Sequence, residues 1–218
     1  MKKNKKVFKL IIIVLLLIVV SYFLYNLRIK NIYVEGNTLL TDQEIIELAN
    51  IENYPKVFKY SNNSIIKKIK MNPIIKDVKV NKNLFGKISI TIEENNLLLK
   101  NQIDNTIYLS NLKTIPDDNK VVGIPSLTNY VEENILNDFL SKLNEVDKDI
   151  LRKISEITYA PSQYDKDLFL LYMNDLNYVY ITTKRLLNIN NYDDIALKLE
   201  GKKGILYLDS GNHFEILD

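Results

Sequence analysis

The sequence has 218 residues, of which 46% are hydrophobic and 26% are charged, so it can form a membrane segment and one or two small folded domains. It contains no cysteine, which excludes disulfide bonds and thiolate metal sites. The formal net charge of +2 is unevenly distributed, because five of the 29 basic residues and none of the 27 acidic ones precede residue 10. The rest of the chain therefore has a net charge of −3, which argues against nucleic-acid binding.

The first predicted element is a membrane-spanning helix over residues 7–25. At about 1.5 Å per residue, this apolar run is roughly 28 Å long, close to the thickness of a hydrocarbon core. A cleaved signal peptide is the alternative, but it needs small residues at its cleavage site, and residues 22–28 contain none. The lysine-rich residues 1–6 predict a cytoplasmic stub, so the C-terminal bulk is expected outside the cytoplasm.

Two short helices are expected after the first exported strand. Thr41 and Glu44 have the spacing of a capping box, which predicts a helix start at that point. Residues 61–63 offer N-caps for a second helix, which the residue before Pro73 should end. The apolar side of this second helix is predicted to carry Ile65, Ile66, Ile69 and Met71.

Alternating apolar residues predict strands over residues 29–35, 75–82 and 86–93, with a hairpin over residues 81–85. In the last strand, Ile88, Ile90 and Ile92 alternate with polar residues. The order is therefore β-α-α-β-β, in which two helices cover one face of a three-stranded sheet.

Four segments of this region resemble a POTRA (polypeptide-transport-associated) domain. They are Ile32-Tyr-Val-Glu-Gly-Asn37, Leu40-Thr-Asp-Gln-Glu-Ile45, Asn72-Pro-Ile-Ile-Lys-Asp-Val-Lys-Val80 and Ile88-Ser-Ile-Thr-Ile-Glu-Glu94. A POTRA domain directly after one N-terminal anchor resembles the FtsQ/DivIB family of bacterial cell division proteins. The resemblance implies a POTRA domain over residues 28–95 and a β-domain over residues 96–218. The family usually has a proline where this chain has Asn83-Leu-Phe-Gly86.

The second half resembles the family's β-domain more loosely, through residues 106–113 and 123–127. A helix is predicted over residues 132–144, with its apolar side formed by Ile135, Leu136, Phe139, Leu140 and Leu143. Strands are predicted over residues 154–159, 168–173, 178–182, 205–209 and 214–217, and a further helix over 193–199. The expected fold class is α+β: a transmembrane helix, a POTRA domain, and a mixed, largely antiparallel β-domain with flanking helices.

The sequence shows no catalytic motif, and neither an enzyme activity nor a cofactor or metal is expected. His213 is the only histidine and is expected in a surface turn. Adjacent acidic pairs point to opposite faces of a strand, which favours solvated or capping roles. Lys67, Lys68 and Lys70 form a basic stretch that suits either a solvated helix face or contact with anionic lipid headgroups or cell-wall polymer.

The resemblance implies a protein-binding role for the β-domain. Family members are understood to add a strand from the partner called FtsB or DivIC, which pairs with FtsL, to the far end of this domain. Ile205, Tyr207 and Phe214 are the corresponding partner-facing candidates, although the same pattern fits residues that pack on their own sheet. A membrane-anchored cell-wall enzyme with two convergent carboxylates and an export or assembly POTRA adaptor are the alternative functions.

Overall fold

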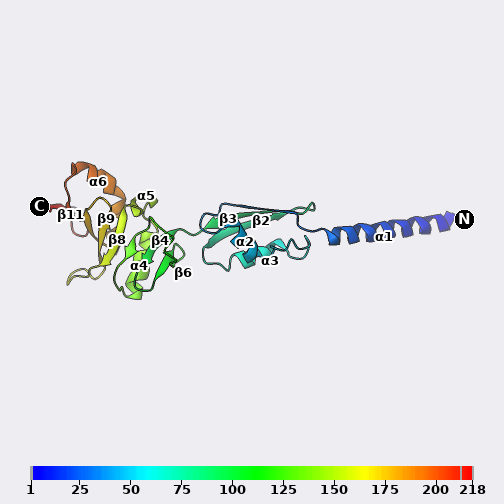
Figure 1. Cartoon of the computed structure of the whole chain (residues 1–218), viewed down its shortest axis with the longest axis horizontal. Coiled ribbons are helices and arrows are strands. Elements are labelled where there is room, and N and C mark those ends of the chain that lie inside the picture. The colour runs from blue at the N-terminus through cyan, green and yellow to red at the C-terminus, as the bar shows by residue number, and fades with distance from the viewer. Residues whose placement is uncertain (1, 212, 218) are drawn as a thin grey trace. The chain divides into compact units, whose positions relative to one another are not determined.

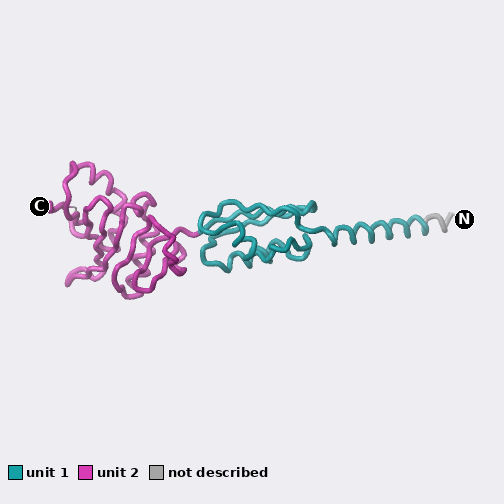
Figure 2. The backbone as a smooth tube through the Cα atoms, in the orientation of Figure 1, with its two compact units in different colours: residues 1–94 teal, residues 95–218 magenta. Residues whose placement is uncertain are grey.

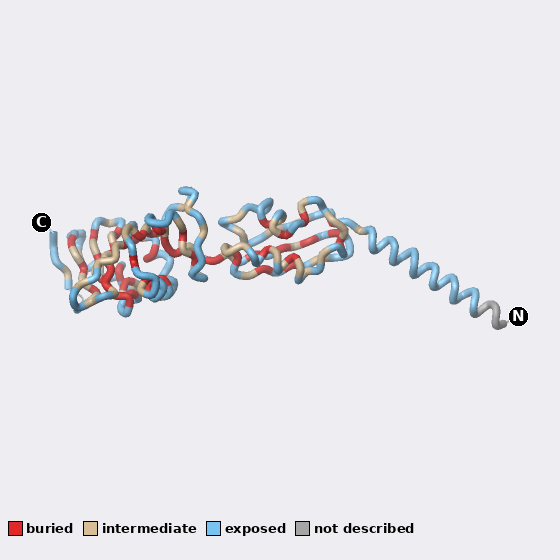
Figure 3. Tube along the Cα trace, turned by 90° about the horizontal axis from the view of Figure 1, so that it is seen from below, coloured by how far each residue is buried: buried red, intermediate tan, exposed pale blue. Residues whose placement is uncertain are grey.

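The computed structural model describes residues 2–211 and 213–217. The chain forms two compact units, Met1–Glu94 and Asn95–Asp218, each described separately below (Figure 2). The first unit begins with helix α1 (Lys2–Asn26). Its segment Val7–Asn26 is long and apolar enough to cross a membrane once. The residues of α1 from Val7 onward are exposed, and the tube is pale blue there in Figure 3, which suits a helix whose surroundings are lipid.

The remainder of the first unit has the predicted β-α-α-β-β order (Figure 1). Its elements are β1 (Asn31–Glu35), α2 (Asp42–Ala49), α3 (Asn62–Ile69), β2 (Ile75–Lys82) and β3 (Lys87–Glu94). The central strand β3 runs parallel to β1 and antiparallel to β2. The core includes Ile88, Ile90 and Ile92 of β3 together with Ile45 of α2 and Ile65 of α3.

The capping box of α2 is confirmed, because the Glu44 amide donates to the Thr41 hydroxyl and the Glu44 carboxylate accepts from the Thr41 amide. The prediction for Met71 is wrong. Helix α3 ends at Ile69, so Met71 lies in the following turn with 78% of its surface exposed. The spacing of the apolar residues predicted a helix that ends two residues later than the observed one.

The Glu94 carboxylate, at the end of β3, holds the loop that joins β1 to α2. It accepts backbone hydrogen bonds from Thr38 (2.9 Å), Leu39 (2.9 Å) and Leu40 (3.0 Å). Partial burial by itself raises the pKa of Glu94, but these donors and the Thr38 hydroxyl outweigh it, so the net pKa is lowered. At neutral pH the charged carboxylate therefore stabilises this loop.

The second unit contains a nine-stranded sheet with the order β12-β11-β10-β9-β8-β7-β4-β5-β6. The strands are β4 (Leu97–Asn101), β5 (Thr106–Leu109), β6 (Thr114–Pro116), β7 (Ser126–Leu127), β8 (Ile154–Tyr159), β9 (Leu168–Met173), β10 (Tyr178–Thr182), β11 (Gly204–Tyr207) and β12 (His213–Ile216). Parallel pairing occurs for β10 with β11, β7 with β8, and β4 with β7, and the other neighbours are antiparallel. The predicted mixed, largely antiparallel β-domain is thus confirmed.

Helices pack on one face of this sheet. They are α4 (Glu133–Leu143), α5 (Lys148–Leu151), the 3₁₀ helix η1 (Thr183–Asn191) and α6 (Tyr192–Lys198). Phe139 of α4 stacks on Phe169 of β9 with ring centroids 3.9 Å apart, and both side chains are fully buried. Leu186 and Ile189 of η1 belong to the same core. Apolar burial on this face fixes which side of each strand points inward.

Candidate functional site

Strand β12 forms one end of the nine-stranded sheet, and it pairs with β11 on one side only among the described residues. The close approach of the two strands depends on Gly204, because a Cβ atom there would lie 1.9 Å from the Glu215 carbonyl oxygen. The Leu217 amide continues the ladder by donating to the Lys203 carbonyl at 3.1 Å. Alternation along an antiparallel strand then turns the backbone groups of Phe214 and Ile216 toward the unpaired side.

The strand register divides the three candidate residues between two faces. Leu206, which is buried, lies opposite Phe214, and Phe214 packs against the domain core. Ile205 and Tyr207 point to the other face, since successive residues of a strand alternate. Phe214 therefore supports β12 from behind, while Ile205 and Tyr207 lie on the open face.

The open face of β9 to β12 is rich in tyrosine. Tyr207 stacks on Tyr180 with centroids 5.5 Å apart and on His213 at 4.4 Å, and its hydroxyl donates to Glu215 at 3.0 Å. This hydrogen bond, with some burial, raises the pKa of Tyr207. We call the half-buried or exposed side chains of this face the tyrosine face: Leu170, Tyr172, Tyr178, Tyr180, Ile205, Tyr207, His213 and Glu215.

A polar network fixes the strands behind this face. The Gly204 amide donates to the Asn177 side chain at 3.0 Å, and Asn177 in turn donates to the Tyr192 hydroxyl at 3.0 Å. The Tyr192 hydroxyl donates to Asp175 at 2.8 Å, and burial raises the pKa of this tyrosine. Helix α6, the β9–β10 turn and β11 are thus joined through one buried amide, so the start of β11 has a defined position.

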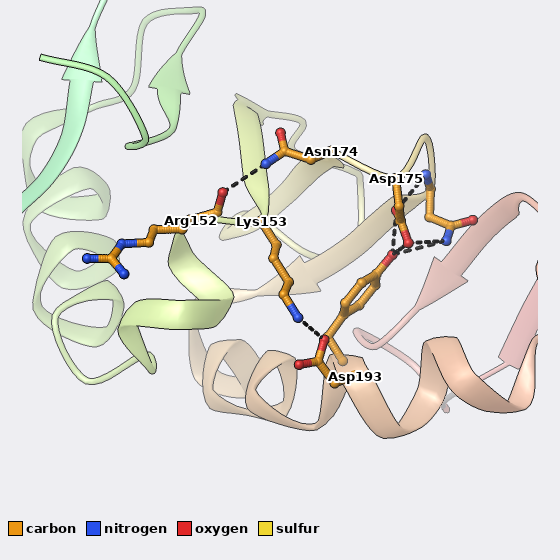
Figure 4. A network of polar contacts seen from close by, with 7 residues as sticks. Arg152, Lys153, Asn174, Asp175 and Asp193 are labelled. Atoms are coloured by element: carbon orange, nitrogen blue, oxygen red, sulfur yellow. Dashed lines mark hydrogen bonds and ion pairs between the residues drawn. The ribbon is translucent and has the colours of Figure 1, made fainter.

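The same network reaches the end of α5. Figure 4 shows Asn174 directed at the backbone carbonyl of Arg152, with a donor to acceptor distance of 2.8 Å, and Lys153 paired with Asp193. Asp193 lies in the first turn of α6, where a carboxylate interacts favourably with the helix dipole. These contacts are exposed and contribute little stability individually.

Known proteins match both halves of the chain. A family model described as "POTRA domain, FtsQ-type" matches residues 27–95. Cell division protein DivIB of Bacillus subtilis is 27% identical over 222 residues, which cover 98% of this chain and 84% of the relative. DivIB of Listeria monocytogenes is 29% identical over 212 residues, covering 94% and 78%. Residues 27–95 thus match an FtsQ-type POTRA domain, and the chain over nearly its whole length is similar to cell division protein DivIB.

A solved structure, the major extracytoplasmic domain of the trans isomer of DivIB from Geobacillus stearothermophilus, aligns with 50% of this chain and 96% of that chain. The identity is 23% and the TM-score 0.42. The two sequence relatives are named as cell division proteins, which supports a divisome role for this chain. Together with its apolar N-terminal helix, these relatives indicate a single-pass membrane protein.

Two carboxylates that line one surface hollow of the β-domain both make structural contacts. A surface hollow of about 320 Å³ in the β-domain is lined by both Asp175 and Asp193. Asp175 accepts from Tyr192, and Asp193 pairs with Lys153. Within the described residues no group of three His, Asp or Glu side chains has the arrangement of a metal site. Asp175 and Asp193 therefore serve to hold neighbouring elements of the β-domain together.

Two smaller predictions need correction or refinement. His213 is exposed as expected, but it is the first residue of β12 and stacks on Tyr207, so it does not lie in a turn. In the basic stretch, the ammonium of Lys68 lies 4.2 Å from the Tyr60 ring centroid and Lys70 pairs with Asp77 at 2.6 Å. Those two lysines therefore make contacts within their own domain.

The sequence identified the residues of β11 and β12 but not their neighbours on the tyrosine face. Tyr172, Tyr178 and Tyr180 come from β9 and β10, whose bounds were predicted correctly. The repeated tyrosines at 178 and 180 were the available signal, because alternate residues of one strand share a face. What the sequence could not supply was the parallel β10–β11 register that aligns Tyr180 with Tyr207.

Proposed function

We propose that this chain is a non-enzymatic bitopic scaffold of the bacterial divisome that binds DivIC/FtsB-like and FtsL-like partners and supports septum formation. Residues 1–6 would lie in the cytoplasm, residues 7–25 in the cell membrane, and the POTRA domain (28–95) and β-domain (96–218) outside. The five lysines among residues 1–9, at the N-terminal end of the apolar run, support this orientation, because positive charge is retained on the cytoplasmic side.

The observation that carries the binding proposal is the side of β12 that pairs with no other described strand. Its backbone groups at Phe214 and Ile216 are available to an incoming strand, and the Ile216 side chain is 53% exposed. Beside this edge, Ile205 and Tyr207 offer apolar and aromatic contact on the tyrosine face. Main-chain pairing would supply affinity, and these side chains would supply specificity.

The three candidate residues have different parts in this proposal. Ile205 and Tyr207 would contact the partner directly, because both side chains face outward from β11. Phe214 packs against the core and would act by holding β12 in register. A charged residue at position 214 is therefore expected to disturb the domain as well as the interface.

The edge is tested by a proline substitution in the full-length chain. Ile216→Pro removes the outward backbone amide, whereas Ile216→Ala keeps it and removes most of the side chain. We expect Ile216→Pro to lose co-purification with a DivIC-like partner and Ile216→Ala to retain most of it. Equal recovery of the partner by both variants would overturn pairing at this edge.

The tyrosine face is tested by Ile205→Asp and Tyr207→Asp, with Glu156→Lys as the control. Glu156 lies on the same face but on β8, three strands from Ile205, and its side chain is exposed. We expect both Asp variants to reduce partner recovery at least about tenfold, as loss of a central contact does. Normal recovery with Ile205→Asp and Tyr207→Asp would remove these residues from the interface.

The division role itself is tested by depletion with imaging. Filamentous or enlarged undivided cells are expected, and normal division after depletion would contradict the proposal. The topology is tested separately with single cysteines, because the chain has none of its own. A cysteine replacing exposed Tyr164 should react with a membrane-impermeant maleimide on intact protoplasts.

A further inference from the structure

The turn between β2 and β3 projects apolar side chains from one end of the POTRA domain. Phe85 is 85% exposed and Leu84 is 54% exposed. Phe58, which is 54% exposed, lines the same surface hollow of about 460 Å³ as these two residues. We call Phe58, Leu84 and Phe85 the apolar tip. Exposed apolar groups gathered in this way mark a contact surface rather than solvated loops.

The structure holds this tip rigidly. The Asn83 side chain accepts hydrogen bonds from the amides of Phe85 and Lys87, both at 3.0 Å. Gly86 adopts φ +82°, and a Cβ atom there would lie 2.4 Å from the Arg28 carbonyl oxygen. The Lys82 ammonium donates to the carbonyls of Val57, at 3.0 Å, and Tyr60, so the loop that carries Phe58 is joined to the β2–β3 hairpin. The exposure of Leu84 and Phe85 is therefore built into the fold.

Backbone contacts place the tip beside the end of the membrane helix. Helix α1 ends at Asn26, and the Val57 amide donates to the Leu27 carbonyl at 2.8 Å. The Lys30 amide donates to the Gly86 carbonyl at 2.7 Å, and the Lys56 ammonium lies 4.1 Å from the centroid of the Tyr25 ring. Residues 25–30 can extend at most about 20 Å, and the polar interface of each leaflet is roughly 5–8 Å thick. The tip thus lies within reach of the lipid headgroups.

The charge around the tip matches an anionic surface. The segments 28–30, 52–60 and 82–87 contain six basic residues and one acidic residue, Glu52. The basic residues are Arg28, Lys30, Lys56, Lys59, Lys82 and Lys87. At the opposite end of the same sheet, β1 and β3 end in Glu35, Glu93 and Glu94. The POTRA domain is therefore polarised along its strands, with its positive end next to the helix.

We propose that this end of the POTRA domain docks on the bilayer surface, with Leu84 and Phe85 inserted at the headgroup boundary and the surrounding basic residues other than Lys82 close to anionic lipid phosphates. Aromatic and apolar side chains favour this depth, and basic residues near an anionic leaflet add attraction. The proposal requires that α1 span the membrane, but it goes beyond partner binding by the β-domain. It assigns the lipid bilayer as the occupant because the tip is continuous with the end of α1.

The test uses the full-length chain in nanodiscs that contain phosphatidylcholine and phosphatidylglycerol. Leu84→Cys supplies a single labelling site for a fluorophore and leaves Phe85 intact, because the chain has no other cysteine. Met71→Cys is the matched control: Met71 is an exposed apolar residue of the same domain, in the turn between α3 and β2, where β2 begins at the opposite end of the sheet. We expect quenchers attached to the lipids to reduce emission at position 84 at least about twofold more than at position 71.

Two further arms complete the test. Adding Phe85→Asp to the Leu84→Cys chain should reduce the lipid-dependent quenching to the level of position 71. Replacing phosphatidylglycerol by phosphatidylcholine should also reduce it, because the lysines lose their anionic partners. Equal quenching at positions 84 and 71 would overturn the proposal, and so would quenching that persists unchanged with Phe85→Asp. Co-purification with a DivIC-like partner should be unaffected by Phe85→Asp, which separates this result from the function of β12.

Discussion

The tyrosine face of the β-domain and the apolar tip of the POTRA domain are supported in different ways. The tyrosine face belongs to a sheet whose reverse side is the β-domain core, so packing behind it fixes the position of each strand. The apolar tip of the POTRA domain is a turn held by side-chain and backbone hydrogen bonds around Asn83 and Lys82. The tyrosine face should therefore be sensitive to substitutions that remove buried side-chain volume. The apolar tip should be sensitive to substitutions that remove hydrogen-bond donors, acceptors or charges.

The largest expected difference comes from the same substitution at two phenylalanines. Phe169→Ala removes a fully buried ring from beneath the tyrosine face and should destabilise the β-domain by about 3–5 kcal/mol. Phe85→Ala removes an exposed ring and should change the stability of the POTRA domain by less than about 0.5 kcal/mol. Urea unfolding of the full chain, followed by hydrogen exchange of peptides from each domain, measures both. Similar losses in the two variants would contradict the distinction.

A second comparison uses two glycines near the β12 edge. Gly204→Ala places a Cβ atom against the Glu215 carbonyl and should push β12 away, at a cost of about 2–3 kcal/mol. Gly211→Ala is the control, because a Cβ there has no neighbour within 4 Å. Amide exchange in β12 should accelerate only in Gly204→Ala, and recovery of the DivIC-like partner should fall with it. Unchanged exchange in β12 would show that the strand tolerates the displacement.

A third prediction concerns the titratable support of the POTRA domain. The folded pKa of Glu94 is lowered, so its carboxylate stabilises the fold fully above the unfolded pKa of about 4.3 and loses this effect as pH falls from there through the folded pKa. Glu94→Gln should therefore cost about 1–2 kcal/mol at pH 7, allowing for solvent screening, and progressively less below about pH 4.

Glu93→Gln provides the control for this pH dependence. Glu93 precedes Glu94 on β3, and its carboxylate makes an exposed ion pair with Lys76 at 2.6 Å. Its substitution should cost less than about 0.5 kcal/mol. Unfolding measured at several pH values distinguishes the two variants, and a pH-independent cost for Glu94→Gln would refute the assigned role of its charge. Peptides of the β-domain should be unaffected in both.

The smallest effect is expected at the turn itself. Asn83→Ala removes the acceptor for the amides of Phe85 and Lys87 and should cost about 1 kcal/mol or less. The more informative readout is local, because exchange of the Phe85 and Lys87 amides should accelerate while the core of β3 is unchanged. Asn83→Asp keeps an acceptor oxygen and should restore slow exchange. If Asn83→Asp exchanges as fast as Asn83→Ala, the turn is held by other contacts.

Local sequence signals predicted the POTRA domain well. The alternation of Ile88, Ile90 and Ile92 and the capping box at Thr41 depend on neighbours only a few residues apart. Strands β8, β9 and β10 were also predicted with their observed bounds. In contrast, β4 was missed, because Leu97-Leu98-Leu99 is a continuous apolar run without a period of two.

The elements before the candidate site were harder to predict for a physical reason. Helix η1 is a 3₁₀ helix with about three residues per turn, so it lacks the 3.6-residue pattern, and the short α5 offers too few residues to show one. The site itself depends on long-range register. Tyr207 and Phe214 read alike in the sequence, and only the pairing of Leu206 with Phe214 shows that they face opposite sides.

Parallel pairing of β1 with β3 has a mechanical consequence. The membrane helix leads into the start of β1, and the second unit follows the end of β3, so tension between them would load neighbouring parallel strands from opposite ends. The paired residues from Asn31 with Lys87 to Glu35 with Thr91 would then share the force in shear rather than separate one at a time. Under such a load, the hydrogen bonds between β1 and β3 would have to break together rather than in sequence.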